Sequence, residues 1–442
     1  MRRNRLLILI TSVVLAIAAV VTFAASAAAR RAASSTHVTS ASTRGRHGAS
    51  ASHGGINHGA GQGPAGAKGG GPMAPVSAAL GLRPGAVSPS AAGIAAAQAV
   101  LPKLTAEQLA GQRVIYSYKG LTPPGSLLTL IRQGDVAGVI FFTDNVGSSA
   151  HIAAVVKELQ QANASPANPV RLPLLLMTDQ EGGVVRRLSG PPTLSAKQIG
   201  QSPTPWATAT NEGGAAGSFM RGLGVNVDLA PVLDVYRTPG NFIDEFGRSF
   251  SNNPGTVEKL GQLFATAMQQ KGVAATVKHF PGLGAATRSQ NTDERPVTLN
   301  VPLSQLRSVD ERPYQAAVAA KVKLAMVSWA VYPALDKTFP AGLSSKIVLG
   351  ELRNRLGFAG VTITDALEAG ALKNFGGTAN RAKLATEAGM DLLLCAEETP
   401  AQGVTARNAL RSDFLASSPT AQANFKAAAE RVLALRATLP TS

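Results

Sequence analysis

The seven residues 278–284, Lys-His-Phe-Pro-Gly-Leu-Gly, decide how we interpret the fold of this 442-residue chain. They follow the apolar run at 273–277. An apolar run that ends in charged residues and then Pro-Gly indicates a buried strand leading into a loop. Lys278 and His279 at the end of such a strand predict a functional site at its C-terminal mouth. The alternative is a lysine in solvent beside a core histidine.

Apolar runs of strand length recur along the chain with helical patterns between them. The eight candidate strands are 113–118, 138–142, 174–179, 225–229, 274–279, 324–328, 360–365 and 390–394. Helical patterns cover 152–164, 257–271, 306–321, 347–356 and 380–388. This alternation predicts an α/β fold, a single closed (β/α)8 TIM-type barrel. The runner-up is a doubly wound open sheet, which usually carries a glycine-rich phosphate loop after its first strand. No such loop follows Tyr118.

The first hundred residues differ from the rest of the chain. Arg2, Arg3 and Arg5 precede an apolar run that closes on small residues, which predicts a signal peptide at 1–29 or, if it stays uncleaved, a membrane anchor. Residues 30–100 are rich in Ala, Ser and Gly and predict a disordered linker. The barrel is then expected over 101–442. The linker histidines lack metal-ligand spacing, so we predict no metal site: His37, His47, His53 and His58.

The formal net charge of +16 is concentrated in this N-terminal part. Residues 1–100 hold nine of the 42 basic side chains and none of the 26 acidic ones. Such a segment suits attraction to an anionic membrane or wall polymer. The leader, and the lack of a basic stripe interleaved with aromatics, argue against nucleic-acid binding. The only cysteine, Cys395, excludes an internal disulfide.

Polar residues end or follow several of the predicted strands. They are Asp179, Asp228, Lys278, His279, Ser328, Trp329 and Asp365. Functional groups at the C-terminal ends of barrel strands converge on one mouth, so we expect a shared site. Asp179 and Asp365 could instead cap the helices that follow them.

Four further stretches agree in order and spacing with a known family. They are Thr-Asp-Gln-Glu-Gly-Gly at 178–183 with Arg187 after it, Asn-Val-Asp-Leu-Ala-Pro-Val-Leu-Asp at 226–234, Gly-Arg-Ser-Phe at 247–250, and Thr-Ile-Thr-Asp at 362–365. Together with 278–284 they resemble the family 3 glycoside hydrolases, especially the bacterial β-N-acetylhexosaminidase branch. The resemblance covers nearly everything from 104 to 394.

This resemblance implies roles for specific residues. Asp365 would be the catalytic nucleophile, since a carboxylate below the anomeric carbon stabilises an oxocarbenium-like state. A terminal sugar would be hydrogen-bonded by Asp179, Arg187, Arg248, Lys278 and His279. Trp329 would be a stacking platform for a sugar face, or else a core or rim tryptophan. No metal or organic cofactor is expected.

The pattern breaks in the loop after residue 284. The hexosaminidase branch carries an Asp-x-His pair there, whose histidine acts as general acid and base. An alignment without gaps places Ser289 and Asn291 at those positions, and neither side chain transfers protons near neutral pH. Leu283 replaces a further histidine of the motif. Asp293 and Glu294 are the candidate replacements, unless they are ordinary solvated loop charges.

We therefore expect a monomeric retaining glycoside hydrolase, secreted or attached to the cell envelope outside the cytoplasmic membrane. Its substrate would be a wall-derived or chitin-like saccharide from which it releases terminal β-N-acetylglucosamine. The first alternative is a β-glucosidase, although those relatives usually add a second α/β domain. The second alternative is a non-hydrolytic saccharide-binding protein that has lost its proton donor.

Overall fold

A computed structural model describes residues 90–440 of the chain. The predicted leader at 1–29 and the linker as far as residue 89 lie outside the described residues and stay predictions. Within 90–440, no helix has the length and apolar content needed to cross a membrane.

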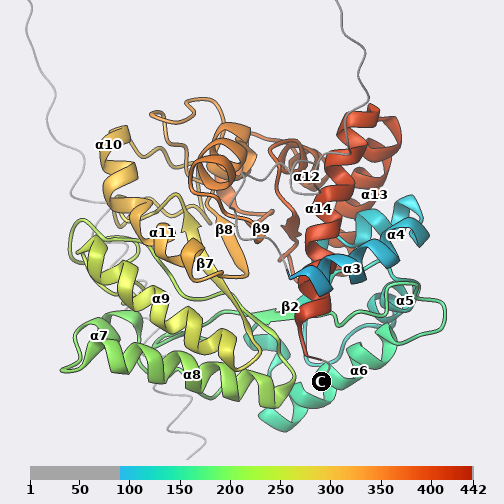
Figure 1. Cartoon of the computed structure of the whole chain (residues 1–442), viewed down its shortest axis with the longest axis horizontal. Helices are drawn as coiled ribbons and strands as arrows, with labels where there is room; N and C mark the ends of the chain where they lie inside the picture. The colour runs from blue at the N-terminus through green and yellow to red at the C-terminus, as the bar shows by residue number, and fades with distance from the viewer. Residues whose placement is uncertain (1–89, 441–442) are drawn as a thin grey trace, which may run out of the picture. The chain divides into compact units, whose positions relative to one another are not determined.

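Eight parallel strands close into a barrel, as predicted (Figure 1). Their order around the wall is β1-β10-β9-β8-β7-β6-β3-β2, and β4 and β5 form a separate antiparallel hairpin after β3. Each predicted strand overlaps one barrel strand, and the sheet closes on itself, so the open-sheet alternative is wrong. The strands are β1 (Val114–Tyr116), β2 (Gly138–Phe141), β3 (Leu175–Thr178), β4 (Gln180–Gly182), β5 (Val185–Arg186), β6 (Val227–Asp228), β7 (Ala274–Phe280), β8 (Leu324–Val327), β9 (Val361–Ala366) and β10 (Leu392–Leu394).

The strands are buried on both faces, which explains their nearly continuous apolar sequences. Alternate residues point to opposite sides of the wall. In β1, Ile115 belongs to the cluster inside the barrel, whereas Val114 and Tyr116 pack in the outer layer under the helices. The inner cluster also holds Met177, Met326, Ile363 and others. This alternation decides which residues at the strand ends face the mouth.

Helices surround the barrel (Figure 1). The predicted helices at 152–164, 257–271 and 380–388 are confirmed. The segment 306–321 is instead a π-helical turn followed by α11, which has Pro313 in its first turn, and 347–356 is π-helical. The helical segments are α3 (Ala91–Val100), η1 (Leu101–Lys103), α4 (Ala106–Gly111), α5 (Gly125–Gln133), η2 (Thr143–Asn145), α6 (Ser149–Asn163), α7 (Ala196–Gly200), α8 (Pro205–Leu223), α9 (Pro254–Gln270), α10 (Leu303–Gln305), η3 (Leu306–Asp310), α11 (Arg312–Ala319), η4 (Ala341–Leu343), η5 (Lys346–Arg355), η6 (Gly370–Leu372), α12 (Thr378–Glu387), α13 (Pro400–Ala416) and α14 (Pro419–Thr438).

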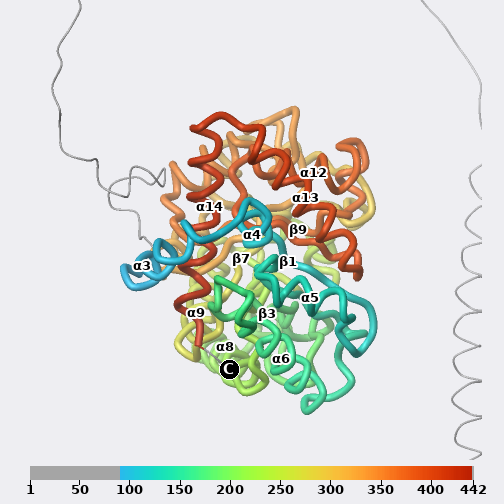
Figure 2. Tube along the Cα trace, turned by 90° about the vertical axis from the view of Figure 1, so that its right-hand side faces the viewer, coloured from blue at the N-terminus to red at the C-terminus, as the bar shows by residue number. Residues whose placement is uncertain are grey.

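The last helix, α14, closes the end of the barrel at which the strands begin. Its Val432 and Leu435 belong to the cluster inside the barrel. Arg436 donates to the backbone oxygen of Pro173, just before β3, at 2.9 Å. Helix α3 packs beside α14 (Figure 2). The predicted end of the linker at residue 100 is therefore wrong, because 91–100 form a helix whose buried face, including Ala97, contacts α14.

Candidate active site

A pocket of about 360 Å³ lies at the end of the barrel where the strands finish. Ligand pockets in proteins typically measure roughly 300–1,000 Å³, so the space suits a small molecule such as a monosaccharide. Seven of the predicted site residues line it: Asp179, Arg187, Arg248, Lys278, His279, Asp293 and Asp365. Apolar side chains from the inner cluster, including Ile140, Met326 and Leu394, form its floor.

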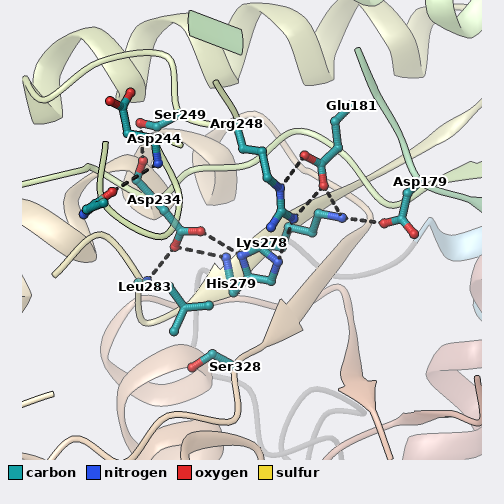
Figure 3. Close-up of polar contacts among 12 residues, drawn as sticks. Asp179, Glu181, Asp234, Asp244, Arg248, Ser249, Lys278, His279, Leu283 and Ser328 are labelled. Carbon is teal, nitrogen blue, oxygen red and sulfur yellow. Dashed lines mark hydrogen bonds and ion pairs between the residues drawn. The ribbon is translucent and has the colours of Figure 1, made fainter. Parts of the chain in front are cut away.

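A network of ionised side chains forms one wall of the pocket (Figure 3). Lys278, at the end of β7, places its Nζ 2.7 Å from Asp179 Oδ1 and 2.8 Å from Glu181 Oε1. Arg248 donates two hydrogen bonds of 2.8 Å to the two carboxylate oxygens of Glu181. Such bidentate, charge-assisted pairs fix geometry strongly. Glu181 was not among the predicted site residues, although it belongs to the motif at 178–183.

The electrostatics keep this network charged. Burial alone would raise the pKa of Glu181, but the charges of Arg248 and Lys278 outweigh burial and hold that pKa well below its usual range. Burial alone would lower the pKa of Lys278, and here Asp179 and Glu181 outweigh it and raise the pKa. The wall therefore presents fixed charged donors and acceptors, which suit the hydroxyl groups of a sugar.

His279 is held by Asp234, a second residue that the sequence analysis did not assign to the site. The Asp234 Oδ2 lies 2.7 Å from His279 Nδ1 (Figure 3). Arg248 Nη2 lies 3.4 Å from His279 Nε2, and a guanidinium can only donate. Nε2 is therefore the acceptor and Nδ1 carries the proton that is donated to Asp234. The carboxylate thus fixes both the tautomer and the orientation of the ring.

The loop after His279 folds back onto the loop after β6. Asp234 Oδ1 accepts a hydrogen bond from Leu283 N at 2.7 Å, so one carboxylate holds both the histidine and this loop. At Gly284 a Cβ atom would lie 1.9 Å from the backbone oxygen of Val235, which leaves no room for a side chain. Leu283 lines the pocket where the resemblance expects a histidine.

Asp365 lies near the end of β9 and lines the pocket. It follows Ile363 by two residues, and Ile363 points into the barrel, so the strand alternation turns Asp365 toward the mouth. Its Oδ1 accepts a hydrogen bond from Ala366 N at 2.8 Å. Asp365 lies within a strand and Asp179 directly precedes β4, so neither residue caps a helix.

The two candidate acid residues, Asp293 and Glu294, are separated by the structure. Asp293 lines the pocket, although the residue as a whole is exposed to solvent. Desolvation in the pocket and the charge of Asp365 raise the pKa of Asp293 to about 6, and the charge of Arg248 opposes them. The Glu294 side chain is 58% exposed and pairs with Arg295 at 2.7 Å. It does not line the pocket, so the prediction of Glu294 as an acid is wrong.

Trp329 is not a stacking platform. It is 1% exposed, and its Nε1 donates to the backbone oxygen of Ala366 at 2.8 Å. Met326 points into the barrel, so Val327 and Trp329 point into the outer layer. The tryptophan supports the end of β9 from behind, which is the core position that the sequence left as the alternative.

Glu368 is a further pocket residue that the sequence analysis missed. Its Oε2 accepts hydrogen bonds from Ala396 N at 3.2 Å and from Gln402 Nε2 at 2.9 Å. Within residues 90–440, no group of three or more His, Cys, Asp or Glu side chains is placed to hold a metal ion. The pocket thus combines a fixed charged wall, the carboxylate of Asp365, and the carboxyl group of Asp293, whose pKa is raised. This set suits acid-assisted substitution at a sugar carbon.

Sequence comparisons with known proteins give consistent matches. The model of the glycosyl hydrolase family 3 N terminal domain matches residues 113–435. A protein of Arthroderma benhamiae, called an uncharacterized secreted glycosyl hydrolase, is 47% identical over 75% of this chain and 93% of its own length. Beta-hexosaminidase A of Pseudoalteromonas piscicida is 30% identical over 66% of this chain, which spans 53% of that relative.

Solved structures give the same result. A family 3 β-N-acetylglucosaminidase from Paenibacillus sp. str. FPU-7 superposes with a TM-score of 0.70 at 34% identity, covering 76% of this chain and 63% of that one. A β-N-acetylhexosaminidase from Beutenbergia cavernae superposes with a TM-score of 0.69 at 32% identity, covering 75% of this chain and 98% of that one. The matched family domain extends over the whole barrel, from β1 into α14. The chain therefore belongs to glycosyl hydrolase family 3.

Proposed function

We propose that this protein is an exported, retaining β-N-acetylglucosaminidase that removes terminal sugars from a wall-derived or chitin-like saccharide. The relatives support this choice of substrate, since the Paenibacillus structure is named as a β-N-acetylglucosaminidase and the Beutenbergia structure as a β-N-acetylhexosaminidase. The export follows from the predicted leader, and the Arthroderma relative is named as secreted.

One observation carries the mechanism: Asp365 and Asp293 line the same pocket, and the pKa of Asp293 is raised to about 6. Glycosidases use two carboxyl groups, one of which must keep its proton until the leaving group departs. A raised pKa keeps part of Asp293 protonated near neutral pH. Its place in the pocket also supports hydrolysis over a role in saccharide binding alone.

In the first step, an oxygen of Asp365 attacks the anomeric carbon while the bond from that carbon to the leaving oxygen breaks. Asp293 gives its proton to the leaving oxygen, which departs as an alcohol. In the second step, the ionised Asp293 takes a proton from water, whose oxygen attacks the anomeric carbon and releases Asp365. Two inversions give net retention, and Asp293 ends protonated again.

The charged wall would hold the terminal sugar during both steps. Lys278 and Arg248 are fixed by their carboxylate partners, and His279 is fixed by Asp234. Donors that are already oriented need little rearrangement when charge develops at the ring, which lowers the barrier. Arg187 lines the same pocket and would add a further donor.

Hydrolysis of matched substrates by the exported protein tests the proposal. We expect a nitrophenyl β-N-acetylglucosaminide to be cleaved at a kcat/KM at least tenfold above that of the matching β-glucoside. Proton NMR of the first product formed should show the β anomer. Preference for the glucoside would favour the β-glucosidase alternative. Binding of the saccharide without turnover of either substrate would favour the binding protein.

A further inference from the structure

Asp293 is carried by a turn that Asn291 forms. The Asn291 Oδ1 accepts a hydrogen bond from Asp293 N at 2.9 Å, and the Asn291 backbone oxygen accepts from Arg295 N at 3.1 Å. Asparagine favours such turns because its side chain bonds to the backbone two residues ahead. Asn291 stands where the family resemblance expects the catalytic histidine. The same position thus holds a turn-forming residue, and a carboxyl group follows two residues later.

The loop that follows Asp365 holds this turn from the other side. Gly370 N donates to the backbone oxygen of Asp293 at 2.7 Å, and Ala371 N donates to that of Thr292 at 3.0 Å. A Cβ atom at Gly370 would lie 2.2 Å from the backbone oxygen of Glu294. Real Cβ atoms do not approach an oxygen so closely, so any side chain there would push the two loops apart. The loop that follows the nucleophile and the turn that carries the candidate acid are therefore held together by backbone hydrogen bonds. The close approach at Gly370 leaves room only for glycine.

Asn291 also bonds to the residue after Asp293, because its Nδ2 donates to Glu294 Oε1 at 3.1 Å. The remaining side-chain contacts of this loop lie farther from Asp293 along the chain. Arg288 pairs with Glu245, but the arginine side chain is 73% exposed, and exposed pairs contribute little. Asn241 Nδ2 donates to the backbone oxygen of Gly284 at 2.8 Å, at the beginning of the loop. The position of the Asp293 carboxyl group therefore depends mainly on the Asn291 turn and on the Gly370 contact.

We propose that Asn291 and Gly370 are positioning residues that hold Asp293 at the pocket mouth for proton transfer. This inference rests on the proposed role of Asp293. Neither residue lines the pocket, so neither is expected to touch the sugar. Removing either would leave the carboxyl group chemically intact while displacing it from the leaving oxygen.

Displacement should also change how Asp293 titrates. The groups that act on it are Asp365 from β9, Asp179 from the end of β3, Arg248 from the loop after β6, and His279 from β7. Moving away from the surrounding protein and from Asp365 removes the two largest causes of the raised pKa. That pKa then falls from about 6 toward the ordinary value of 3.8. A general acid must be protonated, so activity that depends on it should decline at a lower pH.

The test compares Asn291→Ala and Gly370→Ala with Ser289→Ala as the matched control. Ser289 lies in the same loop, is exposed, and contacts only Thr287 Oγ1 at a long 3.4 Å among the described contacts. General acid catalysis contributes about 10²- to 10⁴-fold, and a displaced acid should lose part of this. We expect kcat/KM on the N-acetylglucosamine disaccharide to fall about 10- to 100-fold in both test variants. The nitrophenyl substrate should change less than about threefold, because its leaving group needs little protonation.

Two additional variants separate the possible outcomes. Asn291→Asp keeps an acceptor for Asp293 N and loses only the exposed hydrogen bond to Glu294 Oε1, so it should retain much of the disaccharide activity that Asn291→Ala loses. Its added negative charge should move the loss of activity to higher pH, opposite to Asn291→Ala. Gly370→Ala is excluded by its melting temperature if it does not fold. The comparison of Asn291→Ala with Asn291→Asp then tests the positioning inference by itself.

The positioning inference alone would be overturned by one result. In that result, the ratio of kcat/KM for the disaccharide to kcat/KM for the nitrophenyl substrate, and its pH profile, are the same in Asn291→Ala, Gly370→Ala and Ser289→Ala. The acid assignment is tested separately by Asp293→Asn. If that variant loses disaccharide hydrolysis selectively while the positioning variants do not, the proposed function stands and only the inference fails. If Asp293→Asn behaves like the parent, the acid assignment itself is wrong.

Discussion

Replacing Asp293 by Asn should separate substrates by their leaving groups. The amide keeps the size of the side chain but can no longer give up a proton. A sugar leaving group needs a positioned acid, which is worth about 10²- to 10⁴-fold, whereas nitrophenolate departs unaided. At pH 5, one unit below a pKa of about 6, roughly nine-tenths of Asp293 is protonated in the parent. The full penalty on the disaccharide should therefore appear at pH 5.

The pH dependence gives the magnitude a second check. At pH 7 only about one-tenth of Asp293 is protonated, so the parent itself loses about tenfold on the disaccharide. The penalty for Asp293→Asn should shrink by the same factor between pH 5 and pH 7. The assay is kcat/KM for the disaccharide and for aryl glycosides with a range of leaving-group pKa values. These constants report bond cleavage and exclude the later hydrolysis step.

Azide provides a control for the second step. Asp293 would also act as the base that activates water, so the variant should accumulate the glycosyl enzyme with a nitrophenyl substrate. Azide attacks without a base and should restore turnover, giving a β-glycosyl azide. A penalty that is the same for all leaving groups, or one that does not change with pH, would refute the reasoning.

Asp365→Ala should lower turnover of every substrate by several orders of magnitude with an unchanged melting temperature, whereas Glu294→Ala, outside the pocket, should stay within about threefold in kcat/KM. Lys278→Met removes a buried cation from two carboxylates and should lower the free energy of unfolding by about 3–5 kcal/mol in urea denaturation. A loss below about 1 kcal/mol would show that Arg248 and solvent stabilise the two carboxylates without the lysine. Mass spectrometry of the exported protein should find an N-terminus near residues 26–30, and a chain that begins at Met1 would instead indicate an uncleaved anchor.

The barrel could be predicted because its strands are buried on both faces. Such strands give apolar runs that stand out in the sequence, as in β7 and β9. Helices such as α3 and α14 were missed because their sequences are rich in alanine and have only a weak apolar face. Helix α3 also continues the composition of the linker, so its order comes from packing against α14, which composition does not show.

The site could be predicted where the alternation of side chains along a strand determines the side of the barrel wall to which each side chain points. Asp365 shares its side of β9 with the inward-facing Ile363, and the same rule places Trp329 in the outer layer, an inference that the sequence already permitted. Glu181 and Asp234 were missed because their importance lies in partners far away in the sequence. The choice between Asp293 and Glu294 depends on a loop turn, and no periodicity predicts which of two neighbours faces the pocket.

The most direct test of the account is to identify the residue that bonds to the sugar. A fluorinated glycosyl fluoride of N-acetylglucosamine, which forms the glycosyl enzyme readily but hydrolyses slowly, would be incubated with the exported protein. Mass spectrometry of its peptides should then locate the sugar on Asp365. A label on Asp293 or Glu368, or full turnover with no labelled peptide and an inverted product, would contradict the account.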